Sequence, residues 1–282
     1  MKILLVGINS KFIHPNLAIR YLKANCDYDT DIIEFTIKDK LKDIINNMKI
    51  DQYDIIGFSC YIWNIEIITK LLNHIKKYYH NKTVILGGPE ISYEYDSYLT
   101  NKLAHFILTG ESEVSFNLLM NTIHEKSDYN SVPNLAYIYK DEIIRTKSDQ
   151  IEDLNNLKSP YYFKNDYKDI KNKIQYVELS RGCPYKCSYC LASLENGLRF
   201  FDMEKVFSDI DHLISKGART IKFLDRSFNA NKNIALRFFE KLINKDYPNT
   251  IFQFEINGDV LHKDIINFLK DKLKPNYIRF EL

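Results

Sequence analysis

The sequence has little excess charge of either sign and no long hydrophobic run. Lys and Arg total 39 against 37 Asp and Glu, for a net charge of only +2, so the chain lacks the basic surplus of nucleic-acid-binding proteins. No apolar segment approaches the roughly 20 residues of a membrane-spanning helix, and the first residues lack the features of a signal peptide. We therefore predict a cytoplasmic protein with no membrane span and no nucleic-acid partner.

Cysteine is also scarce, with five residues in 282, yet Cys183, Cys187 and Cys190 lie within eight positions in the stretch ELSRGCPYKCSYCLAS. Three thiols are an odd number for disulfides, which the reducing cytoplasm also disfavours. A structural zinc site takes four ligands, and no further Cys or His lies between residues 178 and 211. An iron–sulfur cluster is favoured, because three thiolates hold three irons of a 4Fe–4S cube and leave the fourth iron open. Zinc, a disulfide and a chance group of core cysteines stay as alternatives.

The first 125 residues alternate between strand and helix signals. Continuous apolar runs are typical of strands buried on both faces, and amphipathic segments between them are typical of helices. We expect strands at 2–8, 31–37, 53–60, 83–89 and 105–110, and helices at 15–25, 40–48, 64–79 and 112–125. The alternation predicts a parallel sheet. Residues 1–125 are therefore interpreted as a Rossmann-type, flavodoxin-like doubly wound α/β domain, with its ligand crevice beyond the carboxyl ends of the strands.

The alternation breaks at residues 126–170, which we interpret as a connector with a β-hairpin that turns near Asp141. It resumes in residues 171–282, where we expect strands at 174–180, 220–225, 251–258 and 276–282, and helices at 203–217, 234–244 and 262–273. A (β/α) barrel of about six units at roughly 30 residues each does not fit this length. The second domain is therefore predicted to be an incomplete barrel, cut off after about four strands.

The stretch CPYKCSYC resembles the C-x3-C-x-aromatic-C motif of the radical S-adenosylmethionine (SAM) enzymes. The domain order resembles the branch with an N-terminal cobalamin-binding domain, and DIIGFSCYIWN, VILGGPE and LTGESEVSF are similar to the strand ends of that domain. The resemblance covers essentially the whole chain. It implies a 4Fe–4S cluster, SAM and cobalamin as cofactors, and reductive cleavage of SAM to a 5′-deoxyadenosyl radical.

The reaction implied by this resemblance is methylation or rearrangement of an unactivated carbon in a small-molecule or peptide substrate. The electron donor would be a protein such as flavodoxin or ferredoxin. The alternative hypothesis is a truncated, non-catalytic protein that binds a corrinoid or a cluster, because the predicted barrel is short. Activity of a longer version beside this chain would separate the two hypotheses.

The resemblance also implies roles for residues in the second domain. Cys183, Cys187 and Cys190 correspond to the cluster ligands. Tyr189 holds the aromatic position, which lies against adenine in the family, although loop packing also explains it. Polar residues at strand ends are candidates for binding SAM: Asp225, Asn257 and Glu281. The family's Gly-Gly-Glu stretch is absent, with LDRSFN in its place, and capping of the next helix is an equal explanation for each of the three.

A cobalamin site is expected at the strand ends of the first domain, at Ser59, Gly87, Gly88 and Gly110. Glycines let a ligand approach the backbone closely, although ordinary turns also use them. A bulky side chain at Gly88 is expected to block the ligand and leave the fold intact. Other cobalamin domains carry an Asp-x-His-x-x-Gly stretch after the first strand. Here GINSKFIHPN has His14 without that Asp and Gly, so we expect no cobalt–His14 bond.

Overall fold

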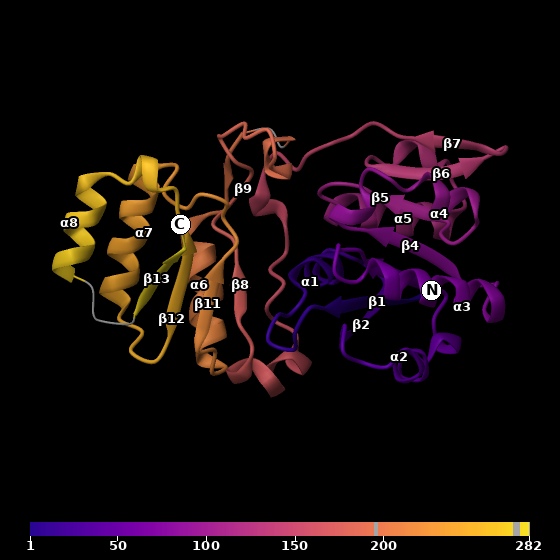
Figure 1. Cartoon of the computed structure of the whole chain (residues 1–282), viewed down its shortest axis with the longest axis horizontal. Coiled ribbons are helices and arrows are strands. Elements are labelled where there is room, and N and C mark those ends of the chain that lie inside the picture. The colour runs from indigo at the N-terminus through magenta and orange to yellow at the C-terminus, as the bar shows by residue number, and fades with distance from the viewer. Residues whose placement is uncertain (195–196, 273–276, 282) are drawn as a thin grey trace. The chain divides into compact units, whose positions relative to one another are not determined.

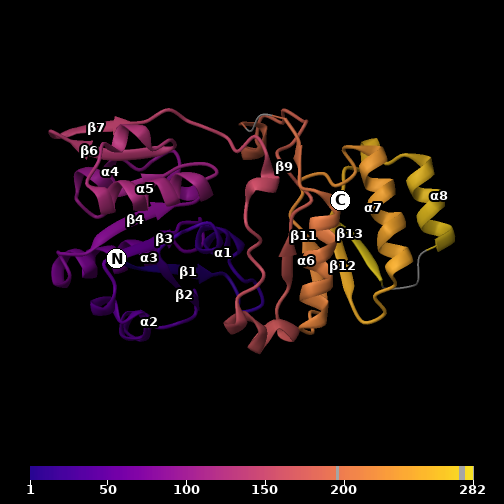
Figure 2. The same cartoon turned by 180° about the vertical axis from the view of Figure 1, so that it is seen from behind.

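A computed structural model describes residues 1–194, 197–272 and 277–281. The chain forms two compact units (Figures 1 and 2), which are Met1–Ile151 with Leu157–Pro160, and Glu152–Asn156 with Tyr161–Leu282. Parts of two predicted elements, at residues 273, 276 and 282, lie outside the described residues. None of the helices in the described ranges has the length and apolarity that crossing a membrane requires.

The first unit is built on one seven-stranded sheet. Its strands are β1 (Lys2–Asn9), β2 (Asp29–Thr36), β3 (Ile55–Ser59), β4 (Thr83–Gly87), β5 (Phe106–Leu108), β6 (Leu135–Tyr139) and β7 (Glu142–Arg145), and its helices are α1 (Leu17–Ala24), α2 (Leu41–Met48), α3 (Ile65–Tyr78), α4 (Asp96–Thr100) and α5 (Glu113–Glu125). The strand order is β2-β1-β3-β4-β5-β6-β7. The first five strands are parallel, which confirms the predicted flavodoxin-like order.

The hairpin predicted in the connector belongs to this sheet. β6 and β7 turn at Lys140 and Asp141, whose φ angles of 49° and 65° are those of a tight hairpin turn. β6 pairs antiparallel with β5, with Leu135 opposite Leu108. The first unit therefore extends to Ile151 instead of ending at residue 125. The sequence pattern indicates a hairpin, but it does not show that the edge of β5 is where the hairpin pairs.

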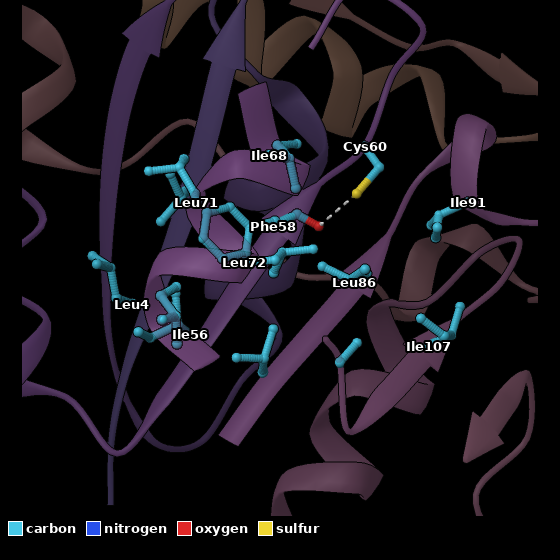
Figure 3. Packing of buried hydrophobic residues seen from close by; sticks show 14 of the residues in the cluster. Leu4, Ile56, Phe58, Cys60, Ile68, Leu71, Leu72, Leu86, Ile91 and Ile107 are labelled. Atoms are coloured by element: carbon cyan, nitrogen blue, oxygen red, sulfur yellow. Dashed lines mark hydrogen bonds between the residues drawn. The ribbon is translucent and has the colours of Figure 1, made fainter. Parts of the chain in front are cut away.

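Helices cover both faces of the sheet. Alternate residues of β1 point to opposite faces, so that Leu4 and Val6 pack with α2 and α3, whereas Ile3 and Leu5 pack with α1 and α5. Figure 3 shows the first of these clusters, where side chains from α3 meet β1, β3, β4 and β5. Burial on both faces explains why these strands have continuous apolar sequences.

Gly88 follows β4 where the backbone comes very close to the residue after β3. Its φ is +112°, and a Cβ at this position would lie 2.5 Å from the carbonyl oxygen of Cys60. A side chain there strains the backbone and collides with a main-chain atom that has little freedom to move. The expectation that a bulky residue at Gly88 leaves the fold intact is therefore wrong.

We predict that Gly88→Ala lowers the free energy of unfolding by about 2 kcal/mol or more. Gly87→Ala is the matched control, because a Cβ there would lie 3.4 Å from the Leu108 carbonyl oxygen, an ordinary contact. It should change the free energy of unfolding by less than about 1 kcal/mol. Urea denaturation of both variants measures this difference, and equal stabilities would contradict the close approach at Gly88.

The second unit contains a four-stranded parallel sheet in the order β13-β12-β11-β8. Its elements are β8 (Gln175–Val177), β9 (Ser180–Arg181), β10 (Arg199–Phe200), α6 (Met203–Ser215), β11 (Thr220–Phe223), α7 (Lys232–Lys245), β12 (Ile251–Glu255), α8 (Lys263–Lys272) and β13 (Ile278–Glu281). The predicted series of four strands with intervening helices is confirmed. β9 and β10 form a separate two-stranded ribbon.

Stacked aromatic rings fill one face of this second sheet. Phe223 and Phe254 stack with centroids 4.8 Å apart, and Phe238 of α7 meets Phe223 edge to face at 5.1 Å. The residues at the alternate positions of these strands have polar side chains. Tyr176 of β8 lies opposite Lys222 of β11, and Lys222 lies opposite Gln253 of β12. One face is thus an apolar core under helices, and the other is polar.

Candidate functional site

The three clustered cysteines lie in a loop that joins β9 to β10. Antiparallel pairing of Ser180 with Phe200, and of Arg181 with Arg199, closes this loop at its base. The side chain of Cys183 is partly buried, while those of Cys187 and Cys190 are exposed. The loop therefore carries all three cysteines on the stretch of chain that follows β8 and β9, and their role as cluster ligands stays a prediction.

Gly182 makes the closure of this cysteine loop possible. Its φ is +91°, and a Cβ at this position would lie only 1.9 Å from the carbonyl oxygen of Gly197. Residue 182 thus has to be glycine for the two ends of the loop to meet. The contact between the backbones of Gly182 and Gly197 therefore fixes the position of the chain just before Cys183.

The donor set fits an iron–sulfur cluster better than a single metal ion. Within the described parts of the chain, no group of three His, Cys, Asp or Glu is placed to hold one metal ion. Zinc draws its ligands to within about 2.3 Å of one point, whereas each cysteine of a 4Fe–4S cluster binds a different iron. Three thiols in one loop are the donor set of a cluster that leaves one iron open.

Tyr189 lies in the same loop and is 91% exposed. Packing against the protein therefore does not explain an aromatic residue at this position. The ring stands next to Cys190 in the chain, so its placement is compatible with stacking on a bound ligand. Contact with the adenine of SAM stays a prediction.

Asp225 supports the chain that leads into the cysteine loop. Its side chain is only 2% exposed, and its two oxygens accept from the Leu179 N–H at 3.0 Å and the Ser180 hydroxyl at 2.6 Å. Burial raises the pKa of this carboxyl to about 7, and the nearby charge of Glu178 adds to the effect. These hydrogen bonds hold the segment before the cysteine loop in position. A contact between Asp225 and SAM stays a prediction.

The other two predicted SAM-binding residues also have partners within the protein. The side-chain oxygen of Asn257 accepts from the Asp259 N–H at 2.9 Å, which is the capping role left as an alternative. Glu281 accepts from Lys222 at 2.6 Å, and Lys222 also pairs with Glu255 at 3.2 Å. Asn257 follows β12 and Glu281 ends β13, which are neighbouring strands of the sheet. Their contact with SAM stays a prediction.

Sequence reasoning missed Lys222, which lies between two carboxylates on the polar face. Partial burial disfavours its charge, but hydrogen bonds from its ammonium to Glu281 and Glu255 raise its pKa. The residue therefore stays protonated. A single Lys between the apolar neighbours Ile221 and Phe223 was the available signal, because alternation in a strand places it on the opposite face.

The predicted cobalamin residues lie at the carboxyl ends of β3, β4 and β5. A Cβ at Gly110 would meet nothing within 4 Å, so the space beside it is open. Gly87 accepts from the Cys60 N–H at 2.7 Å, and Gly88 lies against the Cys60 backbone. Ser59 is buried, and its hydroxyl accepts from the Asn16 side-chain amide at 2.7 Å, so it supports the edge from inside. Successive parallel strands thus bring the four residues to one edge.

Exposed apolar side chains surround this edge, and sequence reasoning missed them. They stand on the loops that follow β1, β3 and β4: Phe12, Ile13, Ile62, Trp63 and Tyr93. Trp63 is fixed by stacking on Tyr61, with centroids 4.5 Å apart, and by an indole N–H that donates to the Ile8 carbonyl at 3.2 Å. Such an apolar rim suits a large, flat ligand. The available signal was the chain's one Trp, directly after the third strand.

The buried state of Asp225 predicts a dependence of stability on pH. Its pKa in the folded chain, about 7, exceeds the ordinary carboxyl value of 3.8. Between these values the unfolded chain has released the proton that the folded chain retains, so the free energy of unfolding falls as pH rises through this range. The loss from this one group is about 4 kcal/mol when complete, at about 1.4 kcal/mol per pKa unit.

Asp225→Asn should flatten this part of the pH profile. We expect urea denaturation of the full chain from pH 4 to pH 8 to show a larger decline for wild type than for the variant. Asp31→Asn, at an exposed surface pair, is the control and should retain the wild-type decline. Parallel profiles for wild type and Asp225→Asn would contradict this assignment.

The fold and the two sites define a class of protein: a Rossmann-type ligand domain joined to a partial (β/α) barrel with a three-cysteine loop. Two family models match the chain, the B12 binding domain at residues 3–119 and the Radical SAM superfamily at residues 177–280. The chain belongs to the radical SAM family, in the branch with an N-terminal cobalamin-binding domain.

Curated relatives are longer than this chain. It is 27% identical over 192 residues to the cobalamin-dependent radical SAM methyltransferase TokK of Streptomyces tokunonensis, covering 62% of this chain and 28% of that protein. It is 26% identical over 219 residues to an anaerobic magnesium-protoporphyrin IX monomethyl ester cyclase of a Synechocystis species, covering 70% of this chain and 42% of the relative. The chain therefore spans less than half the length of these two relatives.

A solved structure shows the same fold. The radical SAM methyltransferase TsrM from Kitasatospora setae, with cobalamin and a [4Fe-4S] cluster bound, superimposes with a TM-score of 0.78 at 15% identity. The match covers 95% of this chain and 59% of that one. The likeness confirms the fold class, an N-terminal doubly wound domain followed by an incomplete radical SAM barrel.

Proposed function

We propose that this chain is the cofactor-binding part of a cobalamin-dependent radical SAM enzyme that methylates an unactivated carbon. The cysteine loop at the end of β8 carries this proposal, because it presents three thiols in a loop closed by Gly182 and the β9–β10 ribbon. The open, apolar edge of the first sheet supports a corrinoid as the second cofactor. The similarity to the methyltransferases TokK and TsrM supports methyl transfer as the reaction.

Each cofactor would be held by a distinct set of residues. Cys183, Cys187 and Cys190 would supply the thiolates of the cluster, with Tyr189 beside the nucleoside of SAM. The edge formed by Gly87, Gly88 and Gly110, with Ser59 beneath it, would take the corrinoid. When bound, the cluster and SAM supply a carbon-centred radical and cobalamin supplies the methyl group.

The residues of the chain act on this chemistry by placement. Gly182 and Asp225 both fix the start of the cysteine loop, the first by a main-chain contact and the second by buried hydrogen bonds. Lys222, Glu255 and Glu281 give the polar face of the second sheet its charge. This face suits a polar group of SAM or of the substrate. A flavodoxin- or ferredoxin-type protein is proposed as the electron donor.

A second candidate reaction is a change in the carbon skeleton of the substrate, by rearrangement or by ring closure, in place of methyl transfer. The similarity to the magnesium-protoporphyrin cyclase, over 70% of this chain, favours it. The two reactions share the cofactors and differ in the fate of the substrate radical. A corrinoid- and cluster-binding chain without turnover is the non-catalytic alternative.

We predict that the anaerobically reconstituted chain binds about four irons and four sulfides. Replacing Cys183, Cys187 or Cys190 by Ala should remove the absorbance near about 400 nm, because each thiolate holds one iron. Cys26→Ala, at a partly buried cysteine outside the loop, is the matched control and should retain both iron and absorbance. Analysis of the iron, sulfide and zinc content measures this, and stoichiometric zinc without iron would contradict the proposal.

A further inference from the structure

One buried carboxylate oxygen holds both ends of the loop between β1 and α1. Asn9, the last residue of β1, donates its side-chain amide to Oε1 of Glu34 at 2.8 Å. The backbone N–H of Asn16, just before α1, donates to the same oxygen at 2.6 Å. The two ends of loop 10–15 are therefore attached to the same residue of β2.

The second oxygen of Glu34 forms a buried ion pair. Oε2 accepts from Arg20 Nη2 at 2.7 Å, and the two side chains are only 8% and 12% exposed. Burial alone would raise the pKa of Glu34, but the charge of Arg20 and the donors from Arg20, Asn16 and Asn9 lower it. The carboxylate is thus ionised, and an ionised acceptor forms stronger hydrogen bonds to the loop ends.

The same network reaches the predicted corrinoid edge. Asn16 donates its side-chain amide to the hydroxyl of Ser59, at the end of β3. β1 lies between β2 and β3, so these contacts cross the point where the strand order reverses. Ligands of doubly wound sheets bind at that point.

The loop held by Glu34 carries part of the apolar rim. Phe12 and Ile13 are 50% and 39% exposed although both are large hydrophobic residues. The positions of these two side chains depend on the loop, because its two attached ends fix the path of the chain past the carboxyl ends of the strands.

We propose that Glu34 is a positioning residue of the corrinoid site. By holding both ends of loop 10–15, it sets where Phe12 and Ile13 stand and thereby sets the affinity for corrinoid. The inference rests on the proposed function of the first unit. The Glu34 side chain is only 12% exposed, and it acts through the loop.

Two double variants separate this role from general stability. Arg20→Met with Glu34→Gln removes both charges and the Arg20 hydrogen bond to the Asn16 carbonyl, but keeps a side-chain oxygen that accepts from Asn9 and Asn16. Arg20→Met with Glu34→Leu also removes the charges and offers no acceptor. Neither variant leaves a buried charge without its partner, which would be the most destabilising outcome. The two differ only in whether the loop ends are held.

The full chain is titrated with hydroxocobalamin, and hydrogen exchange is followed across residues 9–16. We expect the Gln variant to bind close to wild type, and the Leu variant to bind about 10- to 100-fold more weakly, as for other residues that orient a binding group. Exchange in the loop should accelerate in the Leu variant alone. Asp31→Asn is the control, since Asp31 lies on the same strand and pairs with Lys2 at 3.1 Å. It should leave binding unchanged.

Asn9→Ala provides a second variant that keeps the ion pair intact. It releases one end of the loop and should also weaken corrinoid binding and accelerate exchange. If wild type binds corrinoid and all of these variants bind equally well, the positioning role is overturned while the proposed function stands. If wild type itself shows no spectral change or co-elution with hydroxocobalamin, the corrinoid assignment fails, and the role of Glu34 fails with it.

Discussion

Parallel backbone pairing is the constraint on which both sites depend. In a parallel sheet all strands end at the same edge, so residues far apart in the sequence come together there. Ser59, Gly87 and Gly110 meet in this way at the first sheet, and β8 delivers the cysteine loop to the corresponding edge of the second. A shift in strand register would move these residues away from this edge, although the residues themselves would be unchanged.

Each unit uses a buried carboxylate to hold the chain that enters its site. Glu34 accepts from both ends of the loop after β1, and Asp225 accepts from Leu179 and Ser180 before the cysteine loop. Their electrostatics differ. The ion pair with Arg20 lowers the pKa of Glu34, whereas burial dominates at Asp225 and raises its pKa to about 7. Similar hydrogen bonding thus gives a permanently charged support in one unit and a titratable support in the other.

Much of the fold was predictable from the sequence, because buried parallel strands and amphipathic helices leave distinct patterns. The cysteine spacing was equally informative, since ligand geometry constrains it. Tertiary placement was not predictable. The pattern showed the hairpin but not its pairing with β5, and it placed Asp225 at a strand end without showing that its carboxylate faces the protein. The contact between Gly88 and Cys60, and the exposure of Trp63, likewise depend on neighbours that are distant in the sequence.

The central claim is that three thiolates of the cysteine loop leave one iron of the cluster open to SAM. Electron paramagnetic resonance of the reduced cluster, recorded with and without SAM labelled isotopically at its amino nitrogen, tests this claim most directly. We expect SAM to shift the cluster signal and the label to produce a hyperfine coupling to the cluster, because the amino group would bind the open iron. A signal that is unchanged by SAM and carries no such coupling would contradict the account.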